Sequence, residues 1–184
     1  MGDVTLLIAR AREGDRAAFD RLFELLYPEL RRIAHARLSR SVRDTLMDTT
    51  ALVHECYLKF SQAERLTPAD RVHFLSYAAT VMRSIVVDAA RAGLAQRRGG
   101  DAEHVTLGTD IADAAAAPEH EILDVDAALQ EIGKLDARLV RVVEMRYFGG
   151  MKDEEIAQAL GLTDRTVRRD WEKARLLLSK ALRG

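Results

Sequence analysis

Apolar side chains recur at intervals of three and four residues along most of the chain. This spacing places them on one face of an α-helix. The pattern is clear over residues 19–33, 52–60 and 74–86, and it resumes near residue 121. No stretch sustains the alternation of apolar and polar positions that marks a half-buried strand. The sequence therefore predicts an all-α fold.

One segment, residues 99–118, interrupts the helical pattern. It reads GGDAEHVTLGTDIADAAAAP, so it opens with two glycines, lacks periodicity and ends at a proline. Such a composition is typical of a flexible connector. We therefore expect two helical domains, residues 1–98 and 119–184, joined by a flexible acidic linker over 99–118.

The formal net charge of -1 conceals a strong segregation of charge. Residues 1–100 carry 16 Lys and Arg against 12 Asp and Glu, and residues 132–184 carry 12 against 8. Between them, residues 101–131 carry 9 acidic residues and no Lys or Arg. Two mildly basic blocks indicate two modules that could each bind a polyanion. The alternative is that basic excesses of this size belong to an ordinary solvated surface.

The C-terminal block has the spacing of a helix-turn-helix. A leading helix is expected to break at 148–151, Phe-Gly-Gly-Met, and a second helix over 152–160 to end at Gly161. Thr163 or Asp164 is expected to cap the third helix. The leading helix is expected to turn inward the residues Leu139, Val142, Val143 and Tyr147.

The outer face of the third helix is basic near its N-terminus. In a helix-turn-helix, that end reaches base edges in the major groove while neighbouring cations meet phosphates. The alternative is that these charges only solvate a helical bundle, and a stand-alone DNA-binding regulator would carry the same pattern. The residues predicted to contact DNA here are Arg165, Thr166, Arg168, Arg169 and Lys173.

Three segments carry a family resemblance. LDARLVRVVEMRYFGGMKDEEIAQALGLTDRTVRRDWEKARLLL resembles region 4 of the extracytoplasmic-function (ECF) sigma factors, which recognises the minus-35 promoter element. DTTALVHECYLKF and FLSYAATVMRSIVVDAARAGLAQRRGG resemble the polymerase-binding and promoter-melting parts of region 2. The resemblance implies a subunit that directs RNA polymerase to promoters, with polymerase core and promoter DNA as partners.

Region 2 residues take their expected roles from this resemblance. The helix around residues 52–58 would dock on the clamp of the largest polymerase subunit through Leu52, Val53, Glu55, Tyr57 and Leu58. The helix over 77–91 would face the minus-10 element. Its DNA-facing positions would be Arg83, Ser84, Asp88 and Arg91. Arg97 and Arg98, which follow this helix, would add contacts to phosphates. Phe74 is expected to be a core residue and not a base-stacking ring.

The chain departs from the family pattern just before the polymerase-binding helix. Typical members have an alanine-glutamate-aspartate run where this chain has Thr49-Thr50-Ala51. Phosphate on a threonine would restore negative charge near a helix N-terminus, where it is favoured. The sequence thus resembles the subgroup associated with serine/threonine protein kinases, with Thr50 preferred over Thr49 as the modified residue. A plain capping role for the Thr pair is the alternative.

No catalytic pattern accompanies these motifs. The five histidines are scattered, and no glycine-rich phosphate loop or nucleophile elbow occurs. Cys56, the one cysteine, lies on an apolar stripe and is expected to be a buried thiol. We therefore expect a cytoplasmic protein that is not an enzyme, with no cofactor, no metal and no membrane segment. A signalling adaptor that sequesters a partner through its apolar helices is a further alternative.

Overall fold

The computed structural model describes residues 3–37, 47–62, 67–99 and 118–183, apart from the side chains of 97–99 and 118. All elements in these ranges are helical, which confirms the predicted all-α class. Residues 100–117 of the predicted linker lie outside the described ranges. The N-terminal half contains α1 (Asp3–Arg12), α2 (Arg16–Arg37), α4 (Thr49–Gln62) and α5 (Arg71–Gly99). The C-terminal half contains α7 (Pro118–Leu135), α8 (Ala137–Val143), a π-helical turn η1 (Glu144–Phe148), α9 (Asp153–Leu160) and α10 (Asp164–Ala181).

The long helix α5 organises the N-terminal half. Leu52 of α4 and Phe74 and Met82 of α5 are almost fully buried in one apolar cluster that also takes in α2. The Phe60 ring packs against those of Phe74 and Tyr77, with centroids 5.4 and 5.1 Å apart. Complete burial of Phe74 agrees with its predicted core role. Burial of the periodic apolar positions is what holds these helices together.

The leading helix of the C-terminal half does not run on as a plain α-helix. At η1 the Gly149 N–H donates to the Glu144 carbonyl, five residues back, at 3.0 Å. This wider turn shifts the register of the following side chains. Met145 is therefore buried and Tyr147 is 45% exposed, so the prediction that Tyr147 points inward is wrong.

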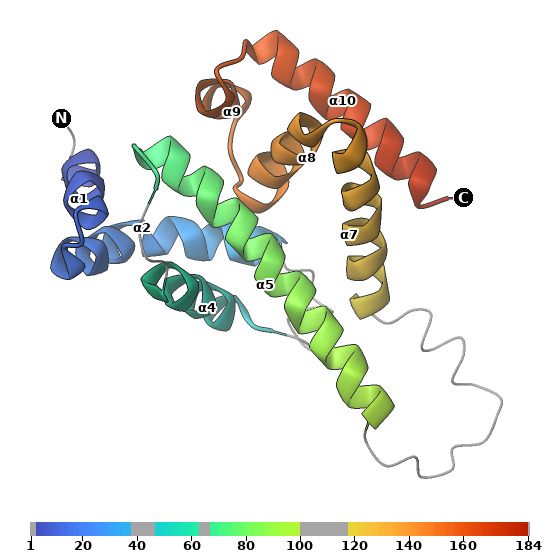
Figure 1. Ribbon diagram of the computed structural model, residues 1–184, viewed down its shortest axis with the longest axis horizontal. Helices are drawn as coiled ribbons and strands as arrows, with labels where there is room; N and C mark the ends of the chain where they lie inside the picture. The colour runs from blue at the N-terminus through green and yellow to red at the C-terminus, as the bar shows by residue number, and fades with distance from the viewer. Residues whose placement is uncertain (1–2, 38–46, 63–66, 100–117, 184) are drawn as a thin grey trace.

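The two halves pack against each other along α5. Figure 1 shows α5 lying between α4 and the C-terminal helices. Met145, Met151 and Ile156 join the same apolar cluster as the N-terminal helices. Glycine permits the close approach, because a Cβ added at Gly149 would lie 3.2 Å from the Cβ of Ala79.

Candidate nucleic-acid and polymerase interface

A tight left-handed turn joins α9 to α10. Gly161 follows α9 with φ 64° and ψ 37°, a conformation that glycine adopts at little cost. Thr163 then caps α10, its hydroxyl accepting from the Thr166 N–H at 3.3 Å. Of the two capping candidates, the structure thus selects Thr163. The geometry confirms the helix-turn-helix, with α9 starting at Asp153 and Lys152 in the capping position.

The basic face of α10 is open. The side chains of Arg168 and Arg169 are 69% and 74% exposed, and Arg165 and Lys173 are exposed as well. Thr166 is half-buried, with its hydroxyl beside that of the capping residue Thr163. An exposed row of cations at the N-terminal end of α10 suits contact with a polyanion.

Contacts on the opposite side fix the orientation of α10. The Arg138 guanidinium of α8 lies 2.7 Å from the carboxylate of Asp170, which is 2% exposed. The Arg146 guanidinium stacks over the Trp171 ring at 5.0 Å and also pairs with Asp153 of α9. These contacts hold α8, α9 and α10 as one unit, so the exposed cations have a defined direction.

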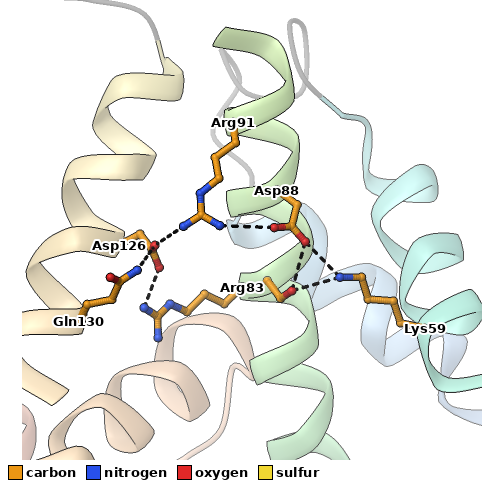
Figure 2. Close-up of polar contacts among 7 residues, drawn as sticks. Lys59, Arg83, Asp88, Arg91, Asp126 and Gln130 are labelled. Carbon is orange, nitrogen blue, oxygen red and sulfur yellow. Dashed lines mark hydrogen bonds and ion pairs between the residues drawn. The ribbon is translucent and has the colours of Figure 1, made fainter. Parts of the chain in front are cut away.

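The predicted DNA-facing residues of α5 lie in a very different setting. Figure 2 shows Arg83 and Arg91 turned towards Asp126 of α7. Arg83 donates to Asp126 Oδ1 at 2.7 Å and to Glu144 Oε1 at 2.8 Å. Its side chain is only 14% exposed, whereas that of Arg91 is 55% exposed. The C-terminal half thus covers Arg83 and leaves much of Arg91 exposed.

Two further α5 positions, Ser84 and Asp88, contact α4. The Lys59 ammonium donates to Ser84 Oγ at 3.1 Å. It also donates to Asp88 Oδ2 at 3.2 Å (Figure 2). Both α5 side chains are exposed. The side chains of Arg97 and Arg98 lie outside the described part of the structure.

A comparison with protein families identifies the kind of protein that carries these surfaces. The family model of the ECF sigma factors matches residues 1–184, the whole chain. The chain belongs to the ECF sigma factor family. It therefore directs promoter recognition by RNA polymerase and binds DNA, in a role that is not enzymatic. A search of the curated proteins finds no match.

The α4 helix of this ECF sigma factor presents only some of its predicted polymerase contacts. Leu52 and Val53 are buried in the core, with exposed fractions of 1% and 0%. Glu55 and Leu58 are exposed, and Tyr57 is half-buried. The Tyr57 hydroxyl donates to Asp20 Oδ1 at 2.9 Å. Of the five predicted contact residues, only Glu55, Leu58 and part of Tyr57 are therefore accessible to a partner.

The Thr pair lies in the first turn of α4, behind a cap formed by another residue. The Asp48 carboxylate accepts from the Ala51 N–H at 2.8 Å. Thr49 is buried, with its hydroxyl 3.5 Å from His35 Nδ1, while Thr50 is half-buried. Because Asp48 caps the helix, neither Thr side chain is needed for that purpose. The first turn of α4 contains no acidic residue.

Sequence reasoning missed the two carboxylates that bind Arg83. Asp126 belongs to the acidic segment 101–131, and a charge count over that segment assigns no partner to any one carboxylate. Glu144 interrupts an apolar run between Val143 and Met145. A charge inside an apolar stripe signals a buried ionic contact, but the sequence does not identify Arg83 as the partner.

The described residues offer little other chemistry. Burial of the Cys56 thiol raises its pKa to about 12, against a smaller lowering by Lys59. Within the described ranges, no group of three His, Cys, Asp or Glu side chains is placed to hold a metal. None of the helices described is both long enough and apolar enough to cross a membrane.

Proposed function

We propose that α1–α5 form sigma region 2 and α7–α10 form sigma region 4. In this arrangement α4 docks on the clamp of the largest polymerase subunit, α5 reads and melts the minus-10 element, and α10 reads the minus-35 element. The observation that carries the proposal is the capped, exposed basic face of α10 in a chain whose whole length matches the family. Residues 99–118 then join the two regions.

We further propose that docking on polymerase is switched on by phosphorylation of Thr50, as in a kinase-associated ECF sigma factor. A phosphate there would add close to two negative charges beside the N–H groups of the first turn. The half-buried position of Thr50 and the absence of acidic residues from that turn support this choice. Thr49 is less suitable because its side chain is buried against His35.

Affinity for core RNA polymerase tests both proposals. We expect Thr50→Glu to tighten binding severalfold and Thr50→Ala to bind no better than wild type, since glutamate restores part of the phosphate's charge. Gln62→Glu is the matched control, because it adds the same charge to the exposed C-terminal end of the same helix. Tight and equal binding by all variants would leave docking intact and remove the switch. No binding by any would contradict the docking proposal and favour a stand-alone regulator.

A further inference from the structure

A cavity of about 330 Å³ lies among α5, α7, η1 and α10. The interior of a folded protein leaves few voids larger than a water molecule. Sites for small molecules, in contrast, have volumes of about 300–1,000 Å³ and are lined mainly by apolar and aromatic side chains. The size of this cavity therefore indicates a binding site for a small molecule.

The floor of the cavity is apolar. It includes Met82 of α5, Leu129 of α7 and Val143 of α8, all of which are buried. These side chains offer water no hydrogen-bond partner, so water in contact with them is easily displaced. An apolar group that takes the place of this water gains free energy from the transfer.

Three aromatic side chains line the same cavity. The rings of Tyr147 and Phe148 meet edge to face with centroids 5.1 Å apart. Trp171 of α10 also lines the cavity, and the Arg146 guanidinium lies over its ring at 5.0 Å. Aromatic side chains bind other aromatic rings in offset or edge-to-face geometry. The lining therefore favours a ligand that contains an aromatic ring.

The π-helical turn η1 places Tyr147 at the mouth of the cavity. A plain α-helix was expected to bury this residue, whereas the wider turn leaves it 45% exposed. Glu121 and Val125 of α7 are also exposed lining residues, so the mouth lies between α7 and η1. Single π-helical turns within helices are frequent at functional sites. The departure from the expected register thus coincides with the entrance to the cavity.

Charge near the mouth disfavours an anion. The described residues that line the cavity include two carboxylates, Glu121 and Asp126, and one cation, Arg83. The Arg83 guanidinium lies 2.7 Å from Asp126 and 2.8 Å from Glu144, so its charge is already balanced. Glu121 is exposed and adds a further negative charge. A neutral or cationic ligand is therefore favoured over an anionic one.

We propose that this cavity binds a small aromatic molecule that is neutral or cationic. Such a ligand contacts α5, α7, η1 and α10 together, and its binding stabilises the folded protein by mass action. The site is additional to the surfaces proposed for polymerase and DNA, and it does not rest on their roles.

Two dyes with one ring skeleton test the site in the full-length protein. N-phenylnaphthylamine is neutral and fluoresces strongly in apolar surroundings, and anilinonaphthalene sulfonate is its anionic counterpart. Trp171, the one tryptophan of the chain, lines the cavity and transfers excitation energy to a dye bound there. Titration of each dye gives its stoichiometry and its Kd.

We expect one neutral dye to bind per chain, with quenching of Trp171. Val125→Phe should weaken this binding severalfold, because the added ring occupies the mouth of the cavity. Leu135→Phe is the matched control, since it enlarges an exposed side chain of the same helix outside the cavity, and it should bind like wild type. If circular dichroism shows that Val125→Phe has lost helix, Val125→Met is measured in its place.

The charge of the ligand is tested separately. Wild type should bind the sulfonate severalfold more weakly than the neutral dye. Glu121→Lys should remove most of this difference, whereas Glu131→Lys, at an exposed position further along α7, should preserve it.

Every other outcome overturns part of the inference. Absence of binding, several dyes per chain, or equal binding by wild type and Val125→Phe would remove the cavity as a ligand site. Equal affinity of wild type for both dyes, or equal effects of Glu121→Lys and Glu131→Lys, would overturn the preference for a neutral or cationic ligand. None of these results bears on the proposed contacts with polymerase and DNA, which are measured with those partners.

Discussion

The left-handed turn at Gly161 allows a prediction with a defined size and sign. A Cβ at this position would meet no heavy atom within 4 Å, so only the backbone conformation opposes Gly161→Ala. That conformation costs an L-residue about 1–2 kcal/mol, offset in part by about 0.4–1 kcal/mol from the reduced freedom of the unfolded chain. We expect a net loss of about 1 kcal/mol in the free energy of unfolding, or about 2–4 °C in Tm for a chain of this size.

Gly133 supplies the matched control, since it lies inside α7 without a positive φ. Its added Cβ would lie 3.4 Å from Val140 Cγ2, in ordinary contact. Gly133→Ala should therefore stabilise by about 0.5–1 kcal/mol through helix propensity. Urea unfolding followed by circular dichroism measures both variants. Equal shifts in the same direction, or a neutral Gly161→Ala, would refute the left-handed turn and the helix-turn-helix geometry built on it.

Two further predictions concern the cap of α10 and the single cysteine. Thr163→Ala should cost about 1 kcal/mol of unfolding free energy, because the N–H of Thr166 loses its acceptor, while Thr163→Ser should recover most of it; an equal loss in both would contradict the cap. Cys56 should resist iodoacetamide in native buffer at pH 8 and react fully in denaturant, since its thiol is buried with a pKa of about 12. Rapid alkylation of the native protein would contradict this burial. The thiol ionises from about pH 9 in the unfolded chain but not in the native protein, so the free energy of unfolding should fall above that pH.

Local signals in the sequence were sufficient for the helix-turn-helix. The glycine after a short apolar helix, followed by a threonine, fixes the turn between α9 and α10 through backbone and capping chemistry alone. The π turn at 144–148 was not predictable in this way. Its register follows from the contact of Glu144 and Met145 with α5, which an α-helical period does not encode.

The packing of the two halves depends on pairings between distant segments. Charge counts show that residues 101–131 are acidic, yet they do not say that Asp126 meets Arg83. The same limit applies to α4, where Leu52 and Val53 carry the family pattern but lie in the core. The spacing of apolar residues along a helix does not distinguish a face that packs in the core from a face that binds a partner.

The two DNA-reading surfaces are tested most directly by selecting DNA fragments with polymerase core reconstituted with the Thr50→Glu form of this sigma factor, which carries negative charge at the proposed switch. We predict two selected boxes, the upstream one read by α10 and the downstream one by α5. Arg168→Ala/Arg169→Ala should relax only the upstream box, and Ser84→Ala/Arg91→Ala only the downstream box. Selection of a single box, or loss of both boxes with either pair of substitutions, would contradict the assignment of the two surfaces.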